Sequence, residues 1–188
     1  MTSMSIKGNP SDRIRARFMK AFSLFAAVLM TFGLFAKTTT WTGAGTGADQ
    51  GKFSASSNWN AGAPEPGDKV VVNGSATWAS ETFSIGEAGL TFVLQKTVTS
   101  SVKFTGAGAI RIAGGKSSDG TLKQEVACDH AGGTYVTGGV LGFGSCGQFG
   151  SGTIVIGQES DTVYGMIKAI DNGNSILNDI EIDRKSVV

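Results

Sequence analysis

The sequence predicts an all-β protein, a right-handed parallel β-helix of short glycine-cornered strands behind an N-terminal signal helix. Three observations support this prediction. Glycine is abundant, with 28 among 188 residues, while charged residues make up only 16%. Short apolar runs rich in Val, Ile, Thr and Phe alternate with turn residues from position 70 onward. Beyond the N-terminus, no run keeps the 3.6-residue apolar period of an amphipathic helix.

The first 36 residues have the composition of an export signal. Five basic residues precede an apolar run of 16 residues at 21–36, which is shorter than a membrane span. We therefore expect a signal peptide at 1–36 that directs the chain to the export machinery and is cleaved after Ala36. An uncleaved membrane anchor is the alternative. Met19 begins a shorter signal that is complete by itself, so it is an alternative start residue.

The next stretch, residues 37–68, is expected to be a leader that caps the coils. It is rich in Gly, Ala and Ser and ends in a turn at 64–68. Its large aromatic side chains need a buried place, and the open end of a stacked structure would provide one. We expect the capping aromatic residues to be Trp41, Phe53 and Trp59.

Strands are predicted throughout residues 69–182, which we expect to form the coils. Each apolar run has about 4 to 8 residues, and a new run starts every 8 to 13 residues. The segment 166–171 has a helical turn as an alternative, but its β-branched neighbours favour a strand. The runs are 70–74, 76–80, 82–89, 90–95, 101–108, 109–115, 121–127, 133–139, 140–144, 152–157, 162–170 and 175–182.

Glycines separate these runs, most densely in GGTYVTGGVLGFGS at 132–145. Glycine weakens the interior of a strand, but it accepts the sharp corners that each coil of a solenoid requires. Stacked coils then bury a continuous core. The glycine spacing therefore favours a β-helix over a β-sandwich, which is the alternative.

The charge balance excludes one class of partner. Without residues 1–36, 11 basic and 14 acidic residues remain, a net charge of −3, which argues against nucleic-acid binding. One histidine and two cysteines cannot complete a four-ligand zinc site, and no calcium-binding nonapeptide is present. We expect no metal site.

Motifs for cofactors and nucleophiles are incomplete. GFGSCG at 142–147 matches a dinucleotide-binding pattern, but the following residues cannot start the helix that such a site needs. GGKSS at 114–118 is read as a corner, so we expect no cofactor. His130 follows Asp129 and is expected to be an exposed turn residue rather than a base for Ser145.

Carboxylates provide the remaining candidate for catalysis. Asp179, Glu181 and Asp183 alternate along one strand face, as do Glu159 and Asp161. We expect solvated outer faces, no catalytic residues and no enzyme. The alternative is a polysaccharide-active lyase or hydrolase, which would need two such groups converging on one groove.

The two cysteines suggest a disulfide. Cys128 and Cys146 are 18 residues apart, close to the length of one coil, so they would stack on neighbouring rungs about 4.8 Å apart. That separation lies inside the Cα range of a disulfide. Two buried free thiols are the alternative.

Residues 132–157, GGTYVTGGVLGFGSCGQFGSGTIVIG, resemble the strand repeat of bacterial autotransporter passenger domains, except at Cys146. Residues 41–72 are similar to segments that open large secreted β-helix proteins. The resemblance implies an adhesin-like protein at the cell surface, in the outer membrane or outside the cell. It also implies contact with surface glycans or with a host or neighbouring cell, and a C-terminal membrane barrel that residues 37–188 do not contain.

The last six residues, DRKSVV at 183–188, differ in composition from the glycine-rich sequence before them. They match the translation of a common short-read sequencing adapter. We therefore expect a non-native tail without function on an N-terminal fragment. A charged, frayed C-terminus is the alternative.

Overall fold

The computed structural model describes residues 36–114, 120–144, 148–160, 163–170 and 175–183. The expected signal, apart from Ala36, and tail residues 184–188 lie outside these ranges. Residues Ala36–Val188 form one compact unit.

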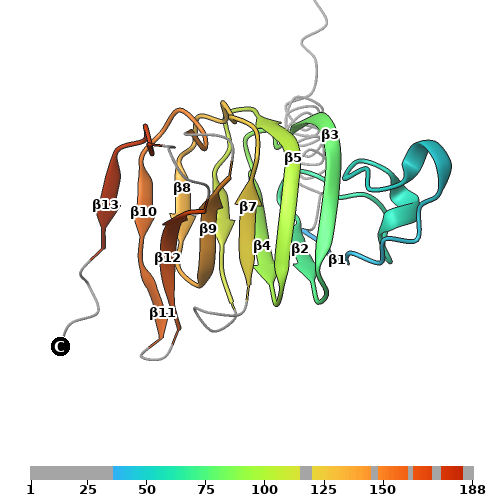
Figure 1. Cartoon of the computed structure of the whole chain (residues 1–188), viewed down its shortest axis with the longest axis horizontal. Helices are drawn as coiled ribbons and strands as arrows, with labels where there is room; N and C mark the ends of the chain where they lie inside the picture. Colours follow the sequence, from blue (N-terminus) through green and yellow to red (C-terminus); the bar gives the residue numbers. More distant parts are fainter. Residues whose placement is uncertain (1–35, 115–119, 145–147, 161–162, 171–174, 184–188) are drawn as a thin grey trace, which may run out of the picture. The chain divides into compact units, whose positions relative to one another are not determined.

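This unit is a parallel β-solenoid of about four turns, which confirms the predicted β-helix (Figure 1). Each full turn contributes one strand to each of two sheets. In order, the seven-stranded sheet contains β1 (Thr38–Thr40), β2 (Lys69–Val72), β4 (Leu90–Leu94), β6 (Ile110–Ile112), β8 (Thr134–Val136), β10 (Ile154–Ile156) and β13 (Ile180–Ile182). The six-stranded sheet contains β3 (Ala76–Ser84), β5 (Thr97–Thr105), β7 (Thr121–Gln124), β9 (Gly139–Phe143), β12 (Val163–Ala169) and β11 (Gln158–Ser160).

The strand pairing distinguishes this fold from the sandwich alternative. Every named strand pair is parallel except β11 with β12, whereas sandwich sheets are antiparallel. Equivalent residues of successive turns therefore stack in rows. One inward row of the seven-stranded sheet contains Val70, Phe92, Ile112 and Val136, all with 0–1% of their surface exposed.

The opposite sheet supplies matching rows. Val98, Leu122 and Leu141 pair in register, and all are fully buried. Burying one such side chain stabilises the fold by about 1.5 to 3 kcal/mol. Because each row repeats the same apolar character at every turn, stacking the turns builds one continuous core.

Glycine at the corners allows the turns to approach closely. Gly89 has φ +73°, and a Cβ atom there would lie 1.9 Å from the carbonyl oxygen of Ala109 in the next turn. A side chain would therefore both strain the backbone and clash with it. The predicted role of glycine as a corner residue is observed at this position.

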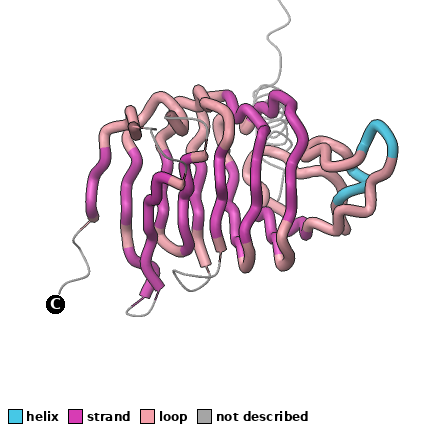
Figure 2. The backbone as a smooth tube through the Cα atoms, viewed as in Figure 1, coloured by secondary structure: helices cyan, strands magenta, loops and turns pink. Residues whose placement is uncertain are grey.

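Short strands and corners make up most of the described chain, as Figure 2 shows. The helical elements are η1 (Gly47–Asp49) and η2 (Ser56–Asn58), both in the stretch expected to be a leader. The same stretch contains β1, which the sequence analysis did not predict. Thr97–Ser100 was also missed and forms the first part of β5. Of the segment 166–171, residues 166–169 belong to strand β12, as favoured, and residue 171 is not described.

Candidate functional site

The outward side of the seven-stranded sheet presents one continuous row of side chains, which we call the outer row. Parallel in-register pairing aligns Thr38, Lys69, Thr91, Arg111, Tyr135, Val155 and Glu181 across seven strands. Neighbouring strands lie about 4.8 Å apart. The outer row is therefore a regularly spaced series of side chains, a geometry that suits an extended ligand.

Arg111 and Tyr135 form the centre of the outer row. The guanidinium carbon of Arg111 lies 4.4 Å from the centroid of the Tyr135 ring, a cation–π contact worth about 0.5 to 1 kcal/mol at an exposed site. Arg111 is exposed, Tyr135 is half-buried, and no ion pair of the described residues includes Arg111. The pair thus offers a held cation beside a flat aromatic ring, which can bind a carboxylate or sulfate and a sugar ring.

The three aromatic residues expected to cap the coils lie together. Trp59 packs edge-on against Trp41 and Phe53, with ring centroids 4.9 and 5.2 Å apart. Its indole N–H donates to the carbonyl of Phe53 at 2.7 Å. Phe53 is fully buried and Trp59 is 5% exposed, while Trp41 is half-buried. The ring centroid of Phe53 also lies 4.8 Å from that of Trp78 in β3, which links these aromatic residues to the first turn.

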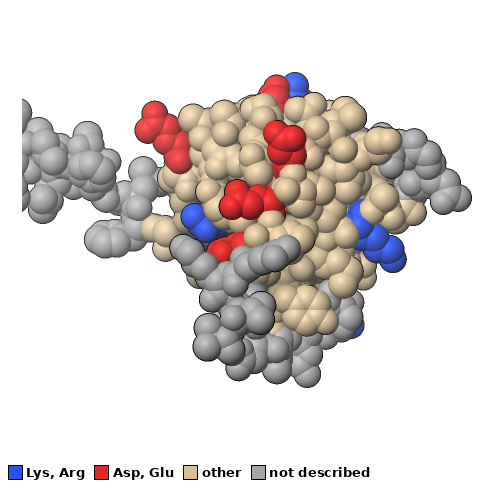
Figure 3. Space-filling view, turned by 90° about the vertical axis from the view of Figure 1, so that its left-hand side faces the viewer, with Lys and Arg blue, Asp and Glu red and all other residues tan. Residues whose placement is uncertain are grey.

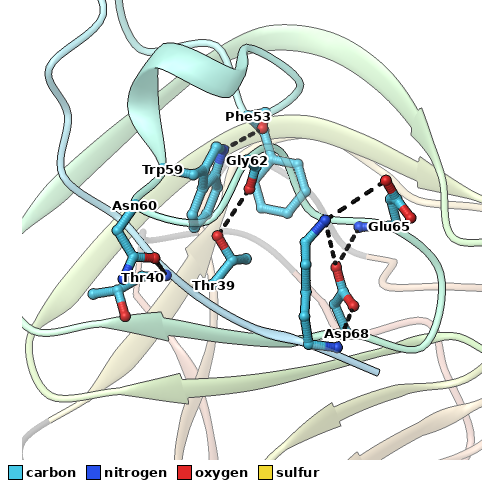
Figure 4. Close-up of polar contacts among 9 residues, drawn as sticks. Thr39, Thr40, Phe53, Trp59, Asn60, Gly62, Glu65 and Asp68 are labelled. Atoms are coloured by element: carbon cyan, nitrogen blue, oxygen red, sulfur yellow. Dashed lines mark hydrogen bonds and ion pairs between the residues drawn. The ribbon is translucent and has the colours of Figure 1, made fainter. Parts of the chain in front are cut away.

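These aromatic residues belong to a segment, residues 41–62, that we call the N-terminal cover. Asn60 accepts a hydrogen bond from the Thr40 amide at 2.7 Å and donates its own amide to the Thr40 carbonyl at 3.1 Å (Figure 4). The Thr39 hydroxyl donates to the carbonyl of Gly62 at 2.9 Å. The N-terminal cover therefore occupies the outer edge of β1.

Next to the cover, a buried carboxylate anchors the start of the described chain. Asp68 is 2% exposed, accepts the amides of Lys37 at 2.8 Å and Glu65 at 2.8 Å, and lies 3.5 Å from the Lys37 ammonium (Figure 4). These contacts hold the start of the described chain against the turn at 64–68, which is the feature that the sequence analysis predicted here.

The prediction that His130 is an exposed turn residue is wrong. The side chain is fully buried, its Nε2 lies 3.0 Å from the Thr134 hydroxyl, and its ring packs against Phe149 at 5.1 Å. Nδ1 has no hydrogen-bond partner among the described residues. Burial lowers the pKa of His130 to about 4, although the nearby Asp129 carboxylate opposes the shift. In the corner between β7 and β8, Cys128 and His130 are buried, whereas Asp129 between them is exposed and pairs with Lys103 at 2.8 Å.

Cys128 is buried in the core beside polar groups. It is 2% exposed, and its sulfur accepts hydrogen bonds from the Phe104 amide at 3.4 Å and from Gln124 Nε2 at 3.3 Å. Gln124, fully buried, also donates to the carbonyl of Val102 at 2.7 Å. Cys146 lies outside the described residues, so the disulfide stays a prediction.

The candidate carboxylates are only partly described. Asp179 and Glu181 are exposed, and Glu181 ends the outer row. Asp183 is also exposed, and its amide donates to the Ile156 carbonyl at 2.8 Å. The Glu159 side chain and all of Asp161 lie outside the described part, as does Ser145.

Of the two glycine-rich motifs, the structure describes only part. Gly142 lies within strand β9, where a Cβ atom would meet Ile170 at 2.2 Å, and Gly114 lies two residues after the end of β6. Residues 115–119 and 145–147 are not described.

The sequence analysis did not predict two asparagine residues whose side chains hold several backbone groups of the corners by hydrogen bonds. Asn58, fully buried, accepts the Gly45 amide at 2.7 Å and donates to the carbonyls of Asp49 and Lys52 at 2.7 and 2.8 Å. Asn178 similarly accepts the Phe149 amide at 2.9 Å and donates to nearby glycine carbonyls. Asparagine between glycine-rich corners is the signal that would have indicated them.

The described ranges contain no group of three or more His, Cys, Asp or Glu residues placed to hold a metal ion. None of their helices is long and apolar enough to cross a membrane.

Comparison with known proteins gives no match: no family model, curated protein or solved structure is similar to the chain. The fold therefore defines the class by itself, a β-solenoid compatible with β-helix repeat proteins.

Proposed function

We propose that the chain is a non-enzymatic, β-helical passenger segment of an exported, autotransporter-like surface protein that contacts acidic glycans through its outer row. The observation that carries this proposal is the Arg111–Tyr135 pair, which holds a cation beside an aromatic ring on the outward side of the sheet.

The location of the repeat-like stretch supports the passenger assignment. Residues 132–157 run from β8 through β9 to β10, so the resembling sequence corresponds to about one turn of the solenoid. Its Gly133, with φ +79°, stands directly before β8, and Gly139, also with φ +79°, begins β9. A repeat unit that coincides with a structural turn is what a passenger repeat requires.

The chemistry of the outer row supports a glycan ligand. A guanidinium can bind a uronate or sulfate with two parallel hydrogen bonds. The adjacent Tyr135 ring provides apolar contact area at a small entropic cost, and Thr91 on the preceding strand supplies a hydroxyl. An acidic, extended polysaccharide matches this arrangement better than a neutral one.

The test is a binding screen with the purified protein against acidic and neutral polysaccharides at low and physiological salt. We expect binding to uronate-containing or sulfated polymers that weakens with salt. Arg111→Ala and Tyr135→Ala should each weaken it at least about threefold, in line with the modest energy of such contacts. Lys96→Ala removes an exposed cation outside the outer row and is the matched control.

Two results would contradict the proposal. Equal loss of binding in Lys96→Ala would indicate nonspecific charge attraction. Shortening of a polysaccharide during the screen would favour the enzyme alternative, above all if Glu159→Gln abolished it. Fractionation of cells that produce the full chain tests export separately, and a wholly cytoplasmic protein would exclude the surface role.

A further inference from the structure

The asparagines of the described chain differ in how their side chains are held. Asn58, Asn60 and Asn178 each form hydrogen bonds to backbone groups. The amide that follows Asn58 is engaged as well, because the Trp59 N–H donates to the Ser56 carbonyl at 3.1 Å. Hydrogen bonds therefore hold these three side chains in fixed positions.

Asn73 is the exception, and it lies in an exposed corner. Residues 73–75, Asn-Gly-Ser, connect β2 to β3, and all three are exposed. Within the described part of the chain, no hydrogen bond includes the Asn73 side chain or the Gly74 amide. Space is also available, since a Cβ atom at Gly74 would meet nothing within 4 Å beyond its chain neighbours. The Asn73 side chain and the next amide are thus free to approach each other.

An asparagine followed by a glycine has a specific chemistry. The deprotonated amide nitrogen of Gly74 attacks the side-chain carbonyl carbon of Asn73 and closes a five-membered succinimide ring. The bond from this carbon to the side-chain nitrogen breaks, and the nitrogen leaves as ammonia, gaining the proton that balances the one lost by Gly74. Glycine favours the attack, because it has no Cβ atom and its backbone adopts more conformations. Water then opens the ring at either carbonyl and leaves aspartate or isoaspartate.

We propose that Asn73 is a self-modification site, at which the chain converts this asparagine to aspartate and isoaspartate without an enzyme. The net reaction consumes one water and releases one ammonia, so it needs no reactant other than the solvent. Isoaspartate routes the main chain through the former side-chain carbon, which lengthens the corner between β2 and β3. This inference does not depend on export or on glycan binding.

The product adds a carboxylate to a sparsely charged surface. Charged residues make up 16% of the sequence, and Figure 3 shows acidic and basic side chains as separate spots on a mostly uncharged face. The corner of the next turn, residues 95–96, stacks on that of Asn73, because β2 pairs in register with β4 and the Gln95 amide donates to the Val72 carbonyl at 2.9 Å. An exposed cation, Lys96, is therefore one turn away from the new carboxylate.

The same three residues, 73–75, also match Asn-X-Ser, the acceptor pattern of N-glycosylation. Glycan transfer needs a separate transferase and an activated glycan donor, whereas ring closure needs only the chain and water. Ring closure is therefore the modification for which this corner itself supplies the reacting groups.

The test is to incubate the purified full chain at pH 8.5 and at pH 6 and to follow acidic forms by isoelectric focusing. We expect an acidic form to accumulate faster at pH 8.5, because the attacking amide must lose a proton. Peptide mass mapping should assign it to position 73 and separate the aspartate from the isoaspartate product. The mapping also distinguishes this pair from the second Asn-Gly pair, residues 172–173, which the structure does not describe.

Gly74→Ala tests the role of the neighbouring amide, since it keeps Asn73 and the open space at position 74 accepts a methyl group. It should slow the conversion about tenfold, because alanine hinders the attack and restricts the backbone. Asn73→Gln should leave no product at this position over the same period, since it would have to close a six-membered ring. Both variants change an exposed residue, so circular dichroism should show an unchanged fold. Asn60, whose side chain is held, is the control within the same digest and should stay unmodified.

Three outcomes would overturn the proposal. Residue 73 remains asparagine at pH 8.5, or Gly74→Ala converts as fast as the unmodified chain, or Asn60 converts as fast as Asn73. A glycan attached to Asn73 in protein isolated from the cells that produce it would assign the corner to glycosylation instead.

Discussion

At the scale of single residues, the polar side chains inside the solenoid define its chemistry. Gln124, Ser100 and Thr134 are fully buried in inward positions that apolar residues occupy in neighbouring turns. A buried polar group costs free energy unless it is hydrogen-bonded. The side-chain nitrogen of Gln124 meets this condition, since it donates to the carbonyls of Val102 and Val126 at 2.7 and 3.0 Å. His130 meets this condition at Nε2, near the Thr134 hydroxyl, but not at Nδ1, which has no hydrogen-bond partner among the described residues.

Because His130 is buried and its pKa is lowered, we predict that acid reduces the free energy of unfolding. Its pKa is about 4 in the folded protein and near 6.5 when unfolded, so the unfolded state binds more protons between these values. Stability from the neutral ring is fully present above pH 6.5 and is lost as the pH falls toward 4. The loss should amount to about 3 kcal/mol.

Urea unfolding at pH 7, 5.5 and 4.5 measures this effect. His130→Gln removes the titrating group while retaining a polar side chain, so its stability should fall less steeply over that interval than that of the unmodified protein. Asp129→Asn is a useful comparison, because it removes the carboxylate that opposes the pKa shift. Equal slopes for His130→Gln and the unmodified protein would exclude His130 as the cause.

At the scale of elements, asparagine side chains replace regular secondary structure in the corners. Asn58 ends η2 and satisfies three backbone groups of the N-terminal cover at once. Gly45 is required opposite it, since a Cβ there would lie 2.5 Å from Asn58 Oδ1. Loops of this kind are held by side-chain hydrogen bonds because they have no ladder of their own.

We predict that Asn58→Ala destabilises the protein by about 2 to 4 kcal/mol, because it leaves buried backbone groups without partners. Asn58→Asp should be at least as harmful, since it places a carboxylate oxygen against two carbonyls. Asn73→Ala, at an exposed position after β2, should change stability by less than about 0.5 kcal/mol. Thermal unfolding compares the stability of the three variants. If Asn58→Ala were as stable as the unmodified protein, the Asn58 hydrogen bonds would not stabilise the N-terminal cover.

Strands were predictable where apolar residues alternate, as in β4 and β6. β1 was missed because Thr38–Thr40 is three threonines without any apolar signal. Thr97–Ser100 was missed because it has a single apolar residue, although Ser100 fills an inward position between Trp78 and Gln124. A small polar residue such as Ser100 leaves room for the larger side chains stacked above and below it. Its inward position therefore depends on residues one full turn away in the sequence, which local patterns do not show.

The candidate sites were less accessible to sequence reasoning than the fold. The outer row joins Arg111 to Tyr135 only through the register of β6 and β8. His130 was assigned to the surface because a lone histidine near glycines resembles a turn residue. Its burial results from the neighbouring turn, where Gly150 leaves room for the imidazole: a Cβ at Gly150 would lie 2.6 Å from Nε2.

At the scale of the whole molecule, the two ends of the described solenoid differ: the N-terminal cover lies against β1, whereas β13 is the last of the described strands in its sheet. Parallel addition of a second copy's β1 to β13 would place Thr38 opposite Glu181 and Thr39 opposite Ile182, a pairing without charge conflict. The N-terminal cover blocks it by occupying β1. Such head-to-tail contacts do not close and would produce filaments.

Opening the N-terminal cover should therefore convert the protein into a head-to-tail polymer. Asn60→Pro removes both the side-chain acceptor and the amide donor that Asn60 offers to Thr40. We expect sedimentation velocity to show a broad series of oligomers and electron microscopy to show unbranched filaments. Adding Ile182→Lys should restore the monomer, because it alters the other partner of the same contact.

Leu141→Ala weakens the core by about 2 to 5 kcal/mol with the cover intact, so it should not form filaments. Filaments in Leu141→Ala, or filaments of Asn60→Pro that persist with Ile182→Lys, would show that general instability rather than the exposed edges drives the assembly.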